Sequence, residues 1–154
     1  MRLTAFTNYA LRTLMYAALR EGRLSLIDDV ASAHGIPRTH IVKCVHQLGR
    51  WGFLANVRGR GGGFRLARAA QTITVGEVVR LTEDGLCLVE CFNPVSNTCP
   101  LCGACTLSTS IKDALNAFLG VLDAVTIADI ARNRVELLPR LGLPHSPHMQ
   151  DAPS

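Results

Sequence analysis

Four of the six cysteines of this 154-residue chain lie in one short segment, CFNPVSNTCPLCGAC, at residues 91 to 105. Seven residues separate Cys91 from Cys99, and two residues separate Cys99 from Cys102 and Cys102 from Cys105. Structural zinc sites usually draw their thiolates from two separated Cys-x2-Cys pairs, whereas cysteines at successive two-residue intervals are typical of iron-sulfur cluster loops. The spacing therefore favours an iron-sulfur cluster, with a structural zinc ion as the alternative.

The same segment has the composition of a loop that curls around a cofactor, because turn-forming residues interrupt any helix or strand. Cys102 has two interpretations: it completes an all-cysteine ligand set, or it is a spare thiol that resolves oxidised intermediates. Cys87 follows an apolar residue near an expected helix end, and Cys44 falls inside an apolar pattern. We expect these two to be buried as small hydrophobic side chains and exclude them from the site. The turn-forming residues of the segment are Asn93, Pro94, Pro100 and Gly103.

The composition predicts a protein that folds without disulfides. With 48% hydrophobic residues, 154 residues can fill the core of one compact domain. The start of the chain does not resemble a secretory signal, because its apolar stretch is interrupted by Arg2, Asn8 and Arg12. No run approaches the ~18 to 20 apolar residues of a membrane span. We expect a cytoplasmic, reduced protein in which clustered cysteines bind metal. No nucleophile, base and orienting residue can be identified together, so an enzyme is not expected.

Positive charge is concentrated in the first half of the chain. Residues 1 to 70 contain 11 Arg and Lys and 3 Asp and Glu, whereas residues 71 to 154 contain 5 and 9. Fourteen of the sixteen cationic residues are Arg, whose planar guanidinium suits phosphates and guanine edges. The basic half therefore predicts a nucleic-acid-binding surface, and a merely solvated basic surface is the alternative.

Hydrophobic spacing predicts three helices in this basic half. The first covers residues 4 to 19. The second starts at Ser25, with Asp28 as its capping-box partner, and a tight turn around Gly35 leads to a third helix at residues 37 to 51. Two short helices joined by a tight turn, the second of them polar and basic, are typical of a helix-turn-helix. The expected apolar face of the third helix consists of Ile41, Val42, Val45 and Leu48.

A β-hairpin is predicted directly after the third helix. Two apolar strands, residues 53 to 57 and 64 to 67, flank a glycine-rich loop that carries Arg58 and Arg60. A cationic loop in this position is the wing of a winged helix-turn-helix, which contacts phosphates or the minor groove. Arg12 on the first helix is expected to add a phosphate contact. The residues expected to reach base edges lie on the first turns of the third helix and are Arg38, Thr39, His40 and Lys43.

A helix at residues 74 to 85, capped by Thr74 and Glu77, and a long amphipathic helix from Leu107 follow, with a short last helix starting at Thr126. Because helix-turn-helix proteins generally read two half-sites, we expect the long helix to form the seam of a homodimer. His145 and His148 lie in a polar tail and are expected to have no role. The predicted fold is mainly α, with a winged helix-turn-helix domain at residues 1 to 84, a cysteine loop at 85 to 106, a dimerisation helix and short helix at 107 to 132, and a tail at 133 to 154 that is disordered at its end.

Three segments of the chain resemble a known family. MRLTAFTNYALRTLMYAAL, HIVKCVHQLGRWGFLANVRGRGGGFRLA and LVECFNPVSNTCPLCGACTL look like the iron-sulfur winged-helix transcriptional regulators that include NsrR, IscR and RirA, over roughly residues 1 to 132. The resemblance implies a dimeric repressor that binds an inverted repeat in double-stranded DNA. It also implies a cluster, 4Fe-4S rather than 2Fe-2S, whose ligands are Cys91, Cys99 and Cys105.

Within that family the segment from His40 to Gly49 and the end of the cysteine loop are most similar to NsrR, a nitric-oxide sensor. NsrR proteins typically carry an Asp where this chain has Asn8, and that Asp supplies the fourth cluster ligand across the dimer. The TNYA start instead resembles RirA, an iron-status regulator. The resemblance thus implies nitric oxide as the signal, with iron or cluster supply as the alternative signal. Asn8 and Cys102 are the two candidates for the fourth ligand.

Overall fold

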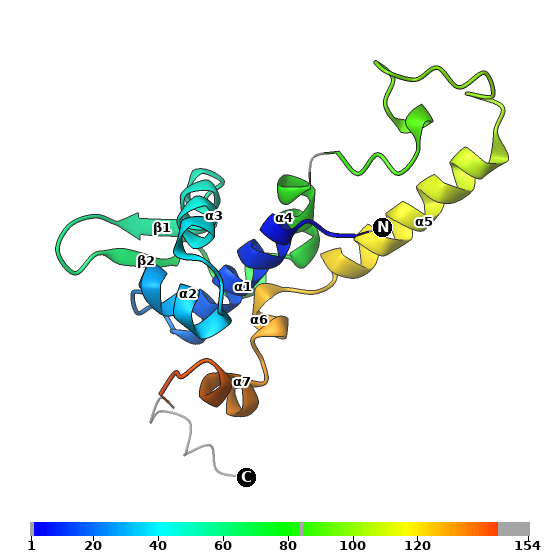
Figure 1. Ribbon diagram of the computed structural model, residues 1–154. Coiled ribbons are helices and arrows are strands. Elements are labelled where there is room, and N and C mark those ends of the chain that lie inside the picture. The colour runs from blue at the N-terminus through cyan, green and yellow to red at the C-terminus, as the bar shows by residue number, and fades with distance from the viewer. Residues whose placement is uncertain (1, 84, 145–154) are drawn as a thin grey trace, which may run out of the picture.

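A computed structural model describes residues 2 to 83 and 85 to 144 as a mainly helical protein with one two-stranded sheet (Figure 1). Within these residues, no helix is both long enough and apolar enough to span a bilayer. The helices are α1 (Ala5–Leu19), α2 (Ile27–His34), α3 (Arg38–Arg50), α4 (Val75–Thr82), α5 (Thr106–Asp123), α6 (Ile127–Ile130) and α7 (Arg134–Arg140). The strands are β1 (Leu54–Val57) and β2 (Gly63–Leu66), and two 3-10 turns are η1 (Ala70–Thr72) and η2 (Glu90–Phe92).

The three helices and the hairpin predicted for the basic half are confirmed. α1 begins directly after Thr4, whose side-chain oxygen accepts a hydrogen bond from the backbone N–H of Thr7. α2 ends at Gly35, which adopts the left-handed conformation (φ +62°) that glycine tolerates without strain. β1 and β2 pair antiparallel, with Leu54 opposite Leu66. The winged helix-turn-helix order is therefore present.

The predicted capping box of α2 is wrong. The N-cap is Leu26, which makes no side-chain cap hydrogen bond. Ser25 is buried and exchanges two backbone hydrogen bonds with Phe64, of 2.8 and 2.9 Å, so it extends the edge of the wing instead of starting the helix. Asp28 forms an ion pair with Arg38. Pairing with β2 satisfies the backbone N–H and carbonyl of Ser25. The backbone at Ser25 therefore follows the strand and does not adopt the position of a helix N-cap.

The main core lies between α1, α3 and the hairpin. Leu14, Ile41, Leu48, Phe53 and Phe64 are fully buried there, and burial of each such side chain contributes about 1.5–3 kcal/mol.

One residue of the apolar face predicted for α3 is misassigned. Val42 is 37% exposed, and Cys44 is buried in its place. With 3.6 residues per turn, position 44 lies between Ile41 and Leu48 on the inner face, whereas position 42 points away from it.

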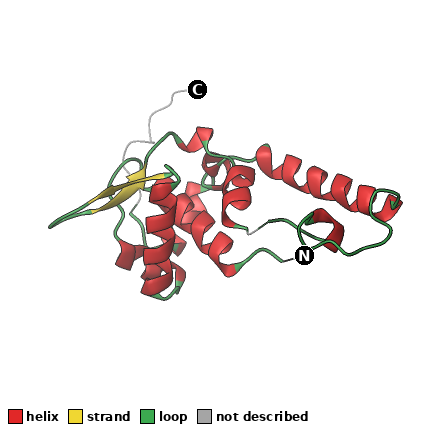
Figure 2. Ribbon diagram, turned by 90° about the horizontal axis from the view of Figure 1, so that it is seen from above, coloured by secondary structure: helices red, strands yellow, loops and turns green. Residues whose placement is uncertain are grey.

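A second, smaller cluster joins α4 to the C-terminal part of α5. Val75, Val79 and Leu119 are buried, with Leu115 and Phe118 packed beside them. Figures 1 and 2 show that the rest of α5 and the cysteine segment extend away from the body. The predicted apolar stripe of α5 is therefore only partly covered within one chain.

The helix starting at Thr126 is confirmed, but it is not the last one. Thr126 and Asp129 form a complete capping box for α6, and α7 follows. Leu138 and Leu143 are buried in the main core, and Arg134 donates a 3.0 Å hydrogen bond to the carbonyl of Leu19. The region predicted as a tail thus continues the fold to residue 144. The two tail histidines, His145 and His148, lie outside the described residues.

Candidate nucleic-acid interface and cysteine segment

The first turns of α3 present the predicted base-contacting residues on the surface. The buried residues of the helix follow one stripe, because hydrophobic positions recur at three and four residue steps. The opposite stripe, which carries most of the cationic side chains of α3, is open to solvent. Its exposed members include all four predicted residues, Arg38, Thr39, His40 and Lys43.

Two of these side chains rest against aromatic rings of α1. The His40 ring lies 5.5 Å from the Tyr9 ring, measured between centroids, and the Lys43 ammonium lies 5.8 Å from the centre of the Phe6 ring. A cation over an aromatic face is attracted by the ring quadrupole. The sequence does not reveal Phe6 and Tyr9 as positioning residues, since their spacing is that of any amphipathic helix.

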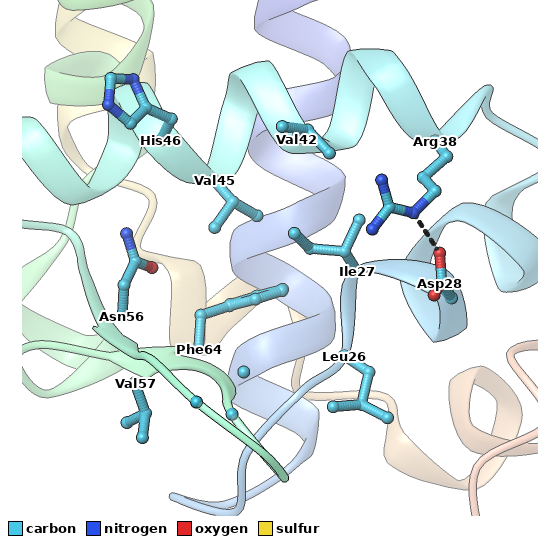
Figure 3. Close-up of a pocket in the computed structure, with 13 residues that line it drawn as sticks. Leu26, Ile27, Asp28, Arg38, Val42, Val45, His46, Asn56, Val57 and Phe64 are labelled. Atoms are coloured by element: carbon cyan, nitrogen blue, oxygen red, sulfur yellow. Dashed lines mark hydrogen bonds and ion pairs between the residues drawn. The ribbon is translucent and has the colours of Figure 1, made fainter.

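Arg38 is oriented by the helix that precedes it. Its Nε donates a 2.6 Å hydrogen bond to Oδ1 of Asp28, and the pair lies at the rim of a cavity of about 410 Å³ between α3, the start of α2 and the wing (Figure 3). The floor of the cavity is apolar and includes Val45 and Phe64. The spacing of Asp28 predicts a cap, and it does not predict the contact with Arg38.

The wing carries its two predicted cations at the tip of the hairpin. Arg58 and Arg60 are exposed in the loop between β1 and β2. Gly62 is required for this loop, because a Cβ there would lie 2.4 Å from the carbonyl oxygen of Val57. The loop is therefore both cationic and tightly turned.

Arg12 is exposed on α1, but its charge acts on the end of α2. Burial lowers the pKa of His34, and the positive charge of Arg12 lowers it further. A neutral imidazole is therefore favoured at this position.

The cysteine segment is irregular, as predicted, and the exposure of its thiols differs. Cys91, Cys99 and Cys105 are half-buried, whereas Cys102 is exposed. The prediction that Cys87 is buried is wrong: it lies in an irregular stretch after Gly85, and it is exposed. Cys44 is buried, as predicted, and burial raises its pKa to about 11.

A carboxylate closes the longest gap between the cysteines. Oε1 of Glu90 accepts hydrogen bonds of 2.7 Å from the backbone N–H of Thr98 and 2.6 Å from its hydroxyl. Glu90 directly precedes Cys91, and Thr98 directly precedes Cys99. This contact therefore brings the backbone next to Cys91 close to the backbone next to Cys99. The Cys91 thiol also lies 3.4 Å from the hydroxyl oxygen of Ser108.

The thiols are chemically suited to hold a metal centre, although the described conformation does not gather them. All six cysteines are free of disulfides, and Cys105 is the N-cap of α5. Across residues 2–83 and 85–144, no three side chains of His, Cys, Asp or Glu form a group that could hold a metal ion. Asn8 is exposed on α1. The donor set fits a thiolate-bound cofactor, whose ligand geometry requires the segment to close.

The start of the segment is fastened to α1. Glu83, at the end of α4, accepts a 2.8 Å hydrogen bond from the backbone N–H of Thr4 and further hydrogen bonds from the hydroxyls of Thr4 and Thr7. Burial raises the pKa of Glu83, but these hydrogen bonds outweigh burial and hold the pKa below its ordinary value. The ionised carboxylate therefore joins α4 to the N-terminus of α1.

Comparison with known proteins agrees with this arrangement. Residues 3–133 match the model of the Rrf2 family, described as an iron-dependent transcriptional regulator. The chain is 44% identical to NsrR of Shouchella clausii over 138 residues (89% of this chain, 93% of the relative) and 41% identical to NsrR of Bacillus subtilis over 139 residues (90% and 95%). The solved structure of IscR from T. potens superposes with a TM-score of 0.67 at 21% identity, covering 87% of this chain and 88% of that one, which supports the fold.

Proposed function

Because the chain belongs to the Rrf2 family of helix-turn-helix transcriptional regulators, we propose that it is a homodimeric, iron-sulfur-dependent repressor that senses nitric oxide. The family assignment makes it a DNA-binding regulator and not an enzyme. The observation that carries the finer proposal is the cysteine segment, in which three half-buried free thiols lie in one irregular loop that ends at the N-terminus of α5. The relatives named NsrR support the resemblance to NsrR, from which we infer nitric oxide as the signal.

In this proposal, two symmetry-related winged helices read an inverted repeat. Arg38, Thr39, His40 and Lys43 contact base edges in the major groove, because they occupy the exposed first turns of α3. The wing and the first helix supply phosphate contacts that give affinity without sequence preference. The residues assigned to those contacts are Arg58, Arg60 and Arg12.

The cofactor is a 4Fe-4S cluster held by Cys91, Cys99 and Cys105. A bound cluster would supply an iron centre that reacts with nitric oxide. The three cysteines hold it as thiolates, and Cys105 does so from the N-cap of α5. The fourth ligand is Asn8 of the partner subunit or Cys102. Asn8 is a weak ligand for iron and Cys102 is exposed to solvent, so either one leaves the fourth iron accessible.

The route from the cysteine segment to α3 follows packed helices. α5 begins at the segment and packs on α4 through Leu119, and α4 is fastened to α1 through Glu83. α1 in turn packs against α3 in the main core. The remaining apolar side chains of α5, such as Leu107 (64% exposed), suit a second copy of the helix as the dimer seam. Opening or closing of the cysteine segment around the cluster therefore alters the spacing of the two α3 helices of the dimer.

The test is to purify the full-length protein without oxygen and to measure iron, acid-labile sulfide and visible absorption before and after stoichiometric nitric oxide. DNA binding is followed on the same samples by fluorescence anisotropy. We expect a coloured protein that loses DNA affinity with nitric oxide, whereas Cys99→Ala should be colourless and unresponsive. Cys87→Ala removes an exposed thiol outside the proposed ligand set and serves as the control. Unchanged DNA binding after the cluster has reacted would contradict nitric-oxide sensing.

A second signal is supported by one residue. Asn8 stands where NsrR proteins typically carry an Asp ligand, and its carboxamide is a poorer ligand for iron than a carboxylate. A weakly held iron suits a regulator that responds to iron or cluster supply. In that case DNA affinity falls on anaerobic iron chelation, while nitric oxide has no effect beyond that of iron loss. A colourless, zinc-containing protein would contradict both signals.

A further inference from the structure

Asp28 contacts one side of Arg38 and leaves the other side free. Asp28 lies in the first turn of α2 and Arg38 is the first residue of α3, so their ion pair spans the turn of the helix-turn-helix. The 2.6 Å hydrogen bond uses only Nε of the guanidinium. Figure 3 shows the two terminal nitrogens of Arg38 turned away from Asp28. The N–H groups of those nitrogens are the ones that can contact O6 and N7 of guanine together.

The ion pair is poorly placed to stabilise the fold. The side chains of Arg38 and Asp28 are 63% and 73% exposed, and ion pairs this exposed contribute little to folding. Instead, Asp28 puts a negative charge on the surface that faces DNA in the proposed function, where phosphates repel it. A carboxylate in that position reduces the attraction of Arg38 to any nearby phosphate, whatever the sequence.

The surroundings of Arg38 also restrict its orientation. Ile27 and Val42 line the cavity beside it, from α2 and from the next turn of α3 (Figure 3). An Arg held at Nε and flanked by apolar side chains loses fewer conformations when it meets a base pair, because part of its freedom is already restricted. Its terminal nitrogens are thus presented in one direction.

We propose that Asp28 is a specificity-determining residue of DNA recognition, acting through Arg38 as a positioning residue. It directs the terminal nitrogens of Arg38 to a guanine edge, and it disfavours the use of Arg38 as a general phosphate contact. This inference rests on the proposed base-reading role of Arg38.

The experiment starts with selection of a preferred sequence from a random duplex DNA pool by the anaerobically purified wild-type protein. Dissociation constants for the selected duplex and a scrambled duplex are then measured over a range of salt concentrations for wild type and Asp28→Asn. We expect Asp28→Asn to bind the scrambled duplex more tightly and to lose selectivity about tenfold, with preference lost at one guanine of each half-site. The slope of log affinity against log salt for the scrambled duplex should steepen by about 0.9, the value for one additional phosphate contact.

Asp29→Asn is the matched control. Asp29 is the next residue of the same helical turn, it is exposed, and within the described residues it forms no ion pair. The control loses the same charge and should keep wild-type selectivity. An equal loss of selectivity in both variants would show an effect of overall charge and would overturn the inference. Asp28→Ser, which also removes the negative charge, repeats the test if the Asn variant melts at a lower temperature than wild type.

Arg38→Ala separates failure of this inference from failure of the proposed function. We expect Arg38→Ala to lose selectivity, and Asp28→Asn to have no further effect in that background. If Arg38→Ala lowers selectivity and Asp28→Asn does not, the inference about Asp28 is overturned while the role of Arg38 stands. If Arg38→Ala leaves the selected sequence unchanged, the base-reading role fails and the inference fails with it. A pool that shows no enrichment with wild-type protein would contradict the proposed function itself.

Discussion

The guanidinium of Arg80 donates two hydrogen bonds, of 2.5 and 2.7 Å, to the two carboxylate oxygens of Asp123. The hydrogen bond from Arg80 holds the pKa of Asp123 below its ordinary value, so the carboxylate stays ionised in this contact. The pair joins the exposed side of α4 to the C-terminal end of α5, beside the packed cluster around Leu119. The approach of these two helices is close enough that Gly76, on α4, lies against Asp123.

Gly76→Ala should therefore destabilise the protein. A Cβ at residue 76 would lie 2.0 Å from Oδ1 of Asp123 and 2.9 Å from its backbone nitrogen, so side-chain movement alone cannot make room. We expect a loss of about 1–3 kcal/mol in the free energy of unfolding, measured by urea titration. Gly120→Ala is the control, because a Cβ there meets nothing within 4 Å in the chain and Ala favours a helix by roughly 0.5–1 kcal/mol. Equal effects of the two substitutions would contradict the close packing at Gly76.

Stability should fall at alkaline pH because of Cys44. Its folded pKa is raised to about 11 by burial, whereas the unfolded thiol titrates near 8.5. Between these values the unfolded chain has lost the proton and the folded chain keeps it, so the free energy of unfolding decreases as pH rises from about 8.5 to 11. This difference of about 2.5 pKa units corresponds to about 3.4 kcal/mol. The measurement is urea unfolding at several pH values, and Cys44→Ala should lose this part of the slope.

Cys102→Ala should keep the visible spectrum of the cluster. Cys102 is exposed, whereas the three family-implied ligands are half-buried. We expect Cys91→Ala, Cys99→Ala and Cys105→Ala each to abolish the spectrum and cluster-dependent DNA binding. Loss of the cluster from Cys102→Ala would favour an all-cysteine ligand set and would overturn the assignment of three ligands.

Glu90→Ala should reduce the amount of cluster that the protein retains. Without the carboxylate, the two hydrogen bonds to Thr98 are lost and the loop that carries Cys91 and Cys99 opens, so more conformational entropy must be lost when the thiols gather. Iron and sulfide content after anaerobic reconstitution measures this effect. Glu136→Ala removes an exposed carboxylate on α7 and should retain wild-type content. Equal iron content in the two variants would remove Glu90 from loop closure.

Arg60→Ala should weaken binding to all DNA sequences alike. Arg60 is exposed in the wing loop, and a phosphate contact there carries no sequence information. We expect the slope of log affinity against log salt to become shallower by about 0.9, with selectivity unchanged. Arg132→Ala is the control, because it removes a cation that is paired with Asp129 and lies outside the winged helix-turn-helix. If Arg60→Ala bound as tightly as wild type at every salt concentration, the wing would have no contact with phosphate.

The sequence by itself determined those features that depend on short-range pattern. The positions of α1, α3 and α5 followed from apolar residues at three and four residue steps, the end of α2 followed from Gly35, and the wing followed from two apolar strands around a glycine-rich loop, whereas α7 was not predicted. The cysteine segment was recognised because ligand spacing in a loop is a local property, and the match of residues 3–133 to the family model confirms the resemblance.

Only the tertiary structure decided which partner each polar side chain takes. Asp28 has the spacing of a cap, but Ser25 pairs with Phe64 across the sheet, which frees Asp28 to meet Arg38. The contact of Arg80 with Asp123 joins residues 43 positions apart, and that of Glu83 with Thr4 joins residues 79 apart. Hydrophobic pattern specifies which face of a helix is buried, but it does not specify the rotation and approach of two helices, and those set the contacts between distant polar groups.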